Sequence, residues 1–171
     1  MESVLPLSET HSPESTDTTA QIVRAAAGAG TPVYPVGGGT ASNYGGRPTR
    51  EGIGLSFDRQ NGLVDYPTRD LTITVESGMT VAELQRLTAK EGQRLPVDIP
   101  QAAVATVGGA VAAAPAGPRR FACGTLRDYV LGLDVVDGTG NVFSTGGRVV
   151  KNAAGYDLSR LQVGALGTLG V

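Results

Sequence analysis

Glycine is the residue that most constrains how this chain can fold. It accounts for 25 of the 171 residues, about twice its usual share of roughly 7 %. Because glycine weakens helices and strands, a folded chain that keeps so many needs backbone that turns tightly or approaches a ligand closely. The glycines follow no three-residue repeat, which excludes collagen. With 40 % hydrophobic and 18 % charged residues, the composition is that of a folded chain rather than a disordered one.

Charge and residue usage exclude several classes of site. The chain carries 14 basic and 16 acidic side chains and no basic stripe, so the phosphate-neutralising surface of a nucleic-acid binder is missing. An aromatic content of 5 %, without tryptophan, also argues against base stacking. Since there is one cysteine, Cys123, and one histidine, His11, we expect no disulfide, no metal site and no zinc-dependent or Ser-His-Asp hydrolysis.

Targeting signals are not found in the sequence either. No run of about 18 apolar residues is present, so we expect no membrane span. Residues 1–16 are rich in Ser, Thr, Glu and Pro and lack the basic start and apolar centre of a secretory signal. We therefore expect a cytoplasmic protein, and a lone cysteine fits a reducing compartment.

The first half of the chain predicts a tail, a helix and several short strands. Residues 1–12 are expected to form an N-terminal tail or an edge segment, and the domain is expected to occupy residues 13–171. An alanine-rich helix is expected over residues 17–29, ended by Gly28 and Gly30. Apolar and alternating runs predict strands at 33–36, 53–57, 63–65 and 71–75.

Turn and capping signals predict the remaining elements. Asn61-Gly62 predicts a hairpin turn before the strand at 63–65. Thr80 and Glu83 form a capping-box pattern that opens a helix, which Gly92 ends. The mixture of short strands and few helices favours an α+β fold over a regular βαβ series. Further elements are expected as a short buried helix within 102–116, a hairpin over 129–144 that turns at 137–140, and one helical turn at 157–161.

The strongest local feature is the loop PVGGGT at residues 35–40. Successive backbone N–H groups in such a loop form a nest that binds phosphate or pyrophosphate, and the Thr40 hydroxyl adds a donor. The loop lacks the lysine of a Walker A motif and the spacing of a Rossmann GxGxxG motif. An ordinary glycine-rich turn explains the same residues equally well.

Three further segments of small residues accompany this loop. Residues 106–110 offer either a backbone surface for a flat ligand or close packing of a short helix on a sheet. Residues 117–120 contain Arg119 and Arg120, which are either ligands for an anionic group or two solvated loop arginines. Residues 164–171 read either as a ligand loop or as the tight entry into a strand. Together, four such loops suit a long ligand with a pyrophosphate and two ring systems.

Six stretches of the sequence resemble the FAD-binding domain of the vanillyl-alcohol oxidase and p-cresol methylhydroxylase type. Their order and spacing agree with this family over nearly all of residues 13–171. The runs KNAAGYDLSRL and GPRRFACGTLRD give a finer resemblance to the smaller FAD-binding subunit of bacterial glycolate oxidases. The six stretches are PVGGGTA at 35–41, DLTITVESGMTVAELQ at 70–85, ATVGGAVA at 105–112, GTLRDYVLGLDVVDGTG at 124–140, KNAAGYDLSRL at 151–161 and GALGTLGV at 164–171.

The resemblance implies two small α+β subdomains that cradle FAD. In the family the first loop wraps the FAD pyrophosphate, the second lies near the isoalloxazine and ribityl chain, and the final segment lies near the adenosine half. The substrate-capping domain of the family is missing after Val171, so we expect a C-terminally incomplete domain. The implied cofactor-binding residues are Pro35, Val36, Gly37, Gly38, Gly39, Thr40, Ala41, Thr106, Val107, Gly108, Gly109, Ala116, Gly117, Gly167, Thr168, Leu169, Gly170 and Val171.

Two departures from the family pattern bear on the cofactor. Some relatives attach FAD covalently through a histidine in the first loop, whereas this loop has none, so the resemblance implies non-covalent FAD. Many relatives carry an acidic residue before the last GTLG, whereas Leu166 stands there in this chain. A carboxylate contact to the cofactor at that position is therefore not expected.

The resemblance also implies a flavin-dependent oxidoreductase that acts on a small 2-hydroxy acid, as a subunit of glycolate oxidase. Other flavoprotein and iron-sulfur subunits are the implied partners, and the fragment alone is expected to be inactive. No catalytic residue is assigned. Arg119, Arg120 and Lys151 are the cations that would favour an anionic reduced flavin or a carboxylate. The alternative is a non-catalytic FAD-binding or assembly subunit, while a Rossmann-type NAD domain is disfavoured because its fingerprint is incomplete.

Overall fold

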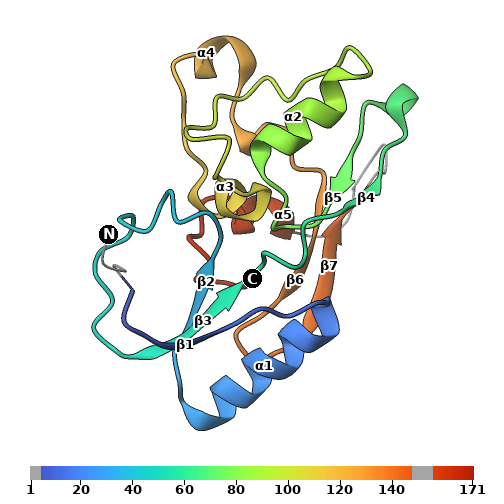
Figure 1. Cartoon of the computed structure of the whole chain (residues 1–171). Coiled ribbons are helices and arrows are strands. Elements are labelled where there is room, and N and C mark those ends of the chain that lie inside the picture. The colour runs from blue at the N-terminus through green and yellow to red at the C-terminus, as the bar shows by residue number, and fades with distance from the viewer. Residues whose placement is uncertain (1–4, 148–155) are drawn as a thin grey trace.

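A parallel three-stranded sheet forms the lower half of the fold in the computed structural model (Figure 1), which describes residues 5–147 and 156–171. Its order is β1-β3-β2, with β1 (Leu7–His11) and β2 (Val33–Val36) on either side of β3 (Gly52–Ser56). Between β1 and β2 the chain forms α1 (Thr16–Ala29), so this part is a βαβ unit with β3 inserted. Residues 7–11 therefore form an edge strand of this sheet rather than a tail. The domain boundary at residue 13 stays a prediction.

Local signals explain the ends of α1 and the composition of β3. Ser15 caps α1 by accepting a hydrogen bond from the Thr18 amide, and Gly30 ends it in the left-handed conformation at φ 64°, as predicted. The middle strand β3 is buried from Gly52 to Leu55, because a strand of a covered parallel sheet has two apolar faces. Leu55 packs with Ala20 and Val23 of α1 in a lower core.

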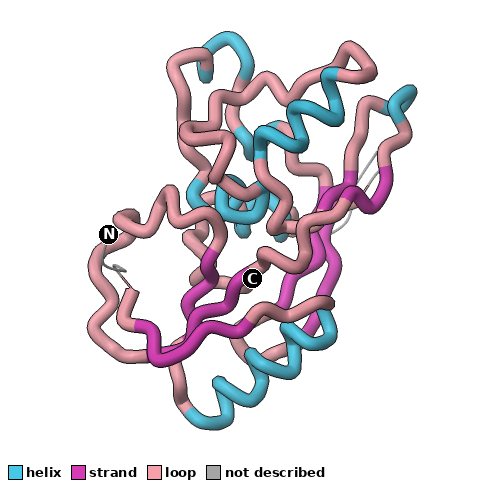
Figure 2. Tube along the Cα trace, viewed as in Figure 1, coloured by secondary structure: helices cyan, strands magenta, loops and turns pink. Residues whose placement is uncertain are grey.

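Two antiparallel strand pairs lie beside this sheet (Figure 2). The hairpin predicted over residues 129–144 is confirmed as β6 (Gly132–Val136) and β7 (Val142–Gly146), although β6 begins three residues later and β7 ends two residues later than expected. The pair β4 (Leu63–Asp65) and β5 (Thr74–Val75) surrounds a 3-10 turn at Thr68–Asp70.

The hairpin predicted at Asn61-Gly62 is wrong, because β3 and β4 belong to different sheets. Two hydrogen bonds between residues distant in the sequence instead hold residues 60–62 next to residues 76–78. The Gly62 amide donates to the Glu76 carboxylate at 2.6 Å, and the Gly78 amide donates to the Gln60 carbonyl at 2.8 Å. The strand expected over 71–75 is reduced to β5, since Leu71 adopts a left-handed conformation at φ 55°.

The upper half contains α2 (Val81–Ala89), α3 (Val107–Ala113), α4 (Arg120–Cys123) and a 3-10 turn at Leu126–Asp128 (Figure 1). The predicted cap is confirmed at α2, where the Thr80 hydroxyl accepts from the Glu83 amide at 3.2 Å. A second core is centred on these elements. It consists of the buried residues Val81, Val97, Ala105, Ala110, Leu126 and Val163.

The short buried helix expected within residues 102–116 is present only as α3, and Ala110 is its one buried residue. The expected helical turn at 157–161 is confirmed as α5 (Leu158–Gln162), capped by Asp157, which accepts from the Arg160 amide. These two packed cores agree with the expected α+β fold of two small subdomains. In the described part of the chain, no helix is long and apolar enough to cross a membrane.

Candidate functional site

The first glycine loop leaves β2 and is pressed against residues 104–106. A Cβ on Gly38 would lie 2.6 Å from the carbonyl carbon of Val104 and closer still to its oxygen. A Cβ on Gly37 would collide with the Thr106 hydroxyl. Gly39 adopts φ 70°, a conformation that L side chains rarely adopt. Side chains are therefore excluded at three successive positions, by collision at Gly37 and Gly38 and by the backbone conformation at Gly39.

This loop presents unused backbone donors. Within the described residues, the amides of Gly37, Gly38, Gly39 and Thr40 donate no hydrogen bond to the protein, and the Thr40 hydroxyl makes none either. Successive free N–H groups that end in a left-handed residue form an anion-binding nest. The geometry therefore supports the phosphate-binding interpretation of this loop over an ordinary turn.

The second loop behaves differently, because its donors are already satisfied. The amides of Val107 and Gly108 donate to the carbonyls of Met79 and Ser77, each at 2.8 Å, and the Gly109 amide donates to the Thr106 hydroxyl at 3.2 Å. A Cβ on Gly108 would lie 2.8 Å from the Ser77 Cβ. The close-packing interpretation therefore holds for Gly108. Gly109 is exposed and remains available to a ligand.

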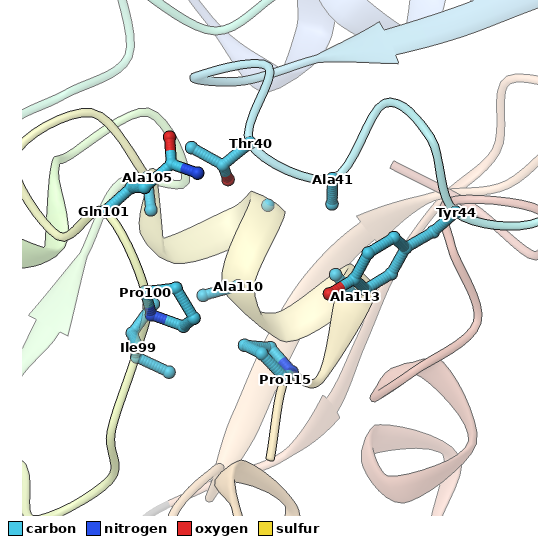
Figure 3. Close-up of a pocket in the computed structure, with 11 residues that line it drawn as sticks. Thr40, Ala41, Tyr44, Ile99, Pro100, Gln101, Ala105, Ala110, Ala113 and Pro115 are labelled. Carbon is cyan, nitrogen blue, oxygen red and sulfur yellow. The ribbon is translucent and has the colours of Figure 1, made fainter. Parts of the chain in front are cut away.

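A small pocket joins the first loop to α3 (Figure 3). Its volume is about 110 Å³, well below the roughly 300–1,000 Å³ of complete ligand sites. One wall is Thr40 and Ala41 of the loop, and the opposite wall is Ala110 and Ala113 of α3, with the Tyr44 ring directed toward Ala113. Its small apolar lining suits the edge of a flat ring.

The segment 99–101 forms a third wall of this pocket, although no motif in the sequence marks it. Its residue Gln101 adopts φ 53°, which aims the chain back toward Ala105, whose amide donates to the Gln101 carbonyl at 2.8 Å. Ile99 and Pro100 also line a second, more open pocket of about 550 Å³. The predicted residues Ala116 and Gly117 lie on that second pocket.

The fourth segment approaches the base of the first loop. A Cβ on Gly167 would lie 3.1 Å from Cγ of Pro35, and the Leu166 amide donates to the Ala112 carbonyl at 2.9 Å. At its end, Val171 exchanges two hydrogen bonds with Val136 of β6, at 2.8 and 2.9 Å. Gly167 is therefore brought next to the first loop, whereas Val171 extends the strand pairing of β6.

Electrostatics around the pockets is dominated by one ion pair. Arg119 is bound to Asp98, which lowers the pKa of that carboxyl below its usual value, since the guanidinium hydrogen-bonds the charged form. The charge of Arg119 is therefore already paired in this structure. The guanidinium carbon of Arg120 lies over the exposed Phe121 ring, 5.8 Å from its centroid, and Lys151 lies outside the described residues. The described residues contain no group of three or more metal-ligating side chains.

Comparison with known proteins identifies a family. A family profile described as "FAD binding domain" matches residues 10–146. The chain is 36 % identical over 159 residues to glycolate oxidase subunit GlcD of Bacillus subtilis, covering 93 % of this chain and 34 % of the relative. It is 42 % identical over 135 residues to glycolate oxidase subunit GlcE of Escherichia coli, covering 78 % and 38 %. Other relatives are named D-lactate dehydrogenase and D-2-hydroxyglutarate dehydrogenase.

A solved structure supports the fold independently. Alkyldihydroxyacetonephosphate synthase superposes with a TM-score of 0.78 at 23 % identity, over 95 % of this chain and 32 % of that one. The chain spans about a third of the length of the curated relatives above. The profile match, the relatives and a loop of free amides closed by glycines all agree, and the chain belongs to the family of FAD binding domains.

Proposed function

We propose that the loop at residues 37–40 holds the pyrophosphate of FAD. The observation that carries this role is the set of free amides at Gly37, Gly38, Gly39 and Thr40, fixed by the contact with Val104. Such a cradle accepts two neighbouring phosphates without a charged side chain, because backbone N–H dipoles supply the positive potential.

The small pocket would receive one ring system of the cofactor next to this loop. Its apolar side chains, including Tyr44 and Pro115, would exclude water from the ring face. The Gly109 backbone is exposed there and permits close approach. No histidine lies in the cradle, which supports non-covalent binding. The remaining predicted positions, among them Thr168 and Leu169, stay candidates for the adenosine half.

We further propose that the complete protein oxidises a small 2-hydroxy acid. Bound FAD supplies the two-electron redox chemistry, and this chain supplies binding, orientation and exclusion of water. The relatives named glycolate oxidase subunits and hydroxy-acid dehydrogenases support this substrate class. Other flavoprotein and iron-sulfur subunits are the partners proposed with it, and the cytoplasm is the proposed location.

A second candidate function is a subunit that binds FAD without catalysing the reaction. One observation favours it. Among the described residues that line the two pockets, the only charged side chains are Asp98 and Arg119, and they neutralise each other. Neither is placed as a free proton acceptor for a hydroxyl group.

Anaerobic mixing separates the two functions. The FAD-loaded protein, assembled with the subunits that accompany it, is mixed with glycolate, D-lactate or D-2-hydroxyglutarate while the flavin absorbance is followed. Bleaching by one of these acids supports oxidation at this flavin. In the assembled enzyme, a Gly38→Val variant that loses its flavin but keeps full turnover would instead establish the assembly function.

A further inference from the structure

An ion pair between the exposed Arg119 and the partly exposed Asp98 joins two segments that line the second pocket. The Nε of Arg119 donates to Oδ1 of Asp98 at 2.8 Å, its Nη2 donates to the same oxygen, and its backbone amide donates to Oδ2 at 3.2 Å. The side chain of Asp98 is 26 % exposed and that of Arg119 is 51 % exposed. Three donors from one residue on one carboxylate fix both the side chain and the backbone of the partner segment.

The neighbouring glycine shows how closely the two segments are fitted. A Cβ on Gly117 would lie 2.7 Å from Oδ2 and 2.9 Å from Cγ of Asp98, and nearer still to its Cβ. The turn at 117–119 can therefore sit on the carboxylate only because residue 117 carries no side chain. The next bond, from the Arg120 amide to the Gly117 carbonyl at 3.2 Å, closes this turn.

The position of Asp98 connects the ion pair to both pockets. Val97, before it, is buried in the upper core. Ile99 and Pro100, after it, form the wall that the two pockets share. A change in the orientation of Asp98 is thus transmitted to the shared wall, because its other side is anchored in the core.

We propose that Asp98 and Arg119 are positioning residues that hold the wall shared by the two pockets in the conformation that receives the ring of FAD. This inference rests on the proposed function. Arg119 acts through Asp98 rather than as a ligand of the cofactor or of a substrate carboxylate, because its guanidinium group is already hydrogen-bonded to Asp98. A wall ordered before binding lowers the entropy lost when the cofactor binds.

A double-mutant cycle tests the proposal. Asp98→Asn, Arg119→Gln and the double variant are titrated with FAD, and the visible absorption and circular dichroism spectra of the bound flavin are recorded. Each single variant is expected to raise the Kd for FAD about 5- to 20-fold. The Kd of the double variant should be no higher than that of the single variant that binds FAD more weakly. The flavin spectra should shift in all three variants, a change that loss of stability alone does not produce.

A matched control accompanies the cycle. Glu83→Gln with Arg86→Gln removes an exposed ion pair of α2 whose two residues line neither pocket, and should leave the Kd unchanged. Arg119→Lys retains the charge without the planar fork, so it should reproduce the spectral shift in a folded protein even if the neutral variants fail to fold.

The outcomes are distinguishable. A wild-type protein that binds no FAD refutes the proposed function, on which the pair depends. If the wild type binds FAD, unchanged Kd and spectra in the folded variants refute the positioning role. Additive losses, or a loss in Arg119→Gln with none in Asp98→Asn, would instead establish Arg119 as a direct ligand. Unchanged binding and spectra in Arg119→Lys overturn the proposal as well.

Discussion

Substitution of one glycine by alanine should dismantle the cofactor loop while the corresponding change elsewhere is harmless. In Gly38→Ala, the new methyl group would lie 2.6 Å from the carbonyl carbon of Val104 and 3.1 Å from its Cγ1, whereas ordinary van der Waals contact begins at 3.4 Å. The closest obstacles are backbone atoms, which cannot rotate away. The carbonyl oxygen of Val104 is the nearest of them, so the loop must move by more than about 1 Å to restore normal contact.

The expected cost follows from this displacement. Overpacking of this kind destabilises a protein by about 1–3 kcal/mol. Moving N–H donors by this distance takes them outside the range of good hydrogen bonds to phosphate. Loss of one bond to a charged group costs about 1.5–3 kcal/mol, which corresponds to a rise in Kd of about 10- to 150-fold.

The assay compares Gly38→Ala with Gly28→Ala. Gly28 lies inside α1, and nothing stands within 4 Å of its added Cβ, so alanine there should raise the free energy of unfolding by about 0.5–1 kcal/mol. Both variants are unfolded in urea and titrated with FAD by flavin fluorescence. If Gly38→Ala bound FAD as tightly as the wild type and unfolded at the same urea concentration, the steric account of the loop would be refuted.

Three further predictions concern stability and capping. Thr106→Ala removes the hydroxyl that caps α3 through the Gly109 amide and touches the first loop, so the free energy of unfolding should fall by about 1 kcal/mol, with weaker FAD binding. Thr80→Ala, which uncaps α2, should show a similar loss of stability in urea without the loss of FAD affinity. Asp137 has its pKa lowered to about 2, chiefly by the Thr139 hydroxyl and then by backbone amides, so its contribution is present above its unfolded pKa near 3.8 and is lost as the pH falls toward 2. Asp137→Asn should accordingly flatten the dependence of unfolding on pH between about 4 and 2, and an unchanged acid limb would contradict that assignment.

The elements that sequence alone predicted correctly are those with local causes. Ser15, Thr80 and Asp157 each cap a helix through a bond to an amide three residues on, and Gly30 ends α1 in the one conformation that favours glycine. The hairpin at residues 132–146 was likewise predictable, since its turn at 137–140 is held by the Asp137 side chain. Such signals involve residues close in the chain.

Long-range contacts account for what the sequence did not predict. The Asn61-Gly62 pair is typical of a hairpin turn, but no hairpin forms there. Gly62 bonds to Glu76 and Gly78 packs against Phe57, so the chain enters another sheet. The role of β1 as an edge strand depends on pairing with β3, some forty residues away.

The candidate site shows the same division. The first loop was identified from its glycines, yet the free amides of Gly37 to Thr40 and the satisfied amides of Val107 and Gly108 differ only through their partners in space. The Ile99–Gln101 wall and the bond between Asp98 and Arg119 carry no local pattern that marks them. The glycine content identified the loops, and only the packing distinguishes amides that are left free from amides that are already hydrogen-bonded.

The most direct test of the account is a titration of the flavin-free protein with FAD, followed by acid precipitation of the complex. We predict saturable binding of one FAD per chain, quenched or shifted flavin fluorescence, and release of intact FAD into the acid supernatant. Absence of saturable binding would contradict the assignment of the loop at residues 37–40 as the pyrophosphate cradle. Flavin that remained attached to the precipitated protein would contradict non-covalent binding.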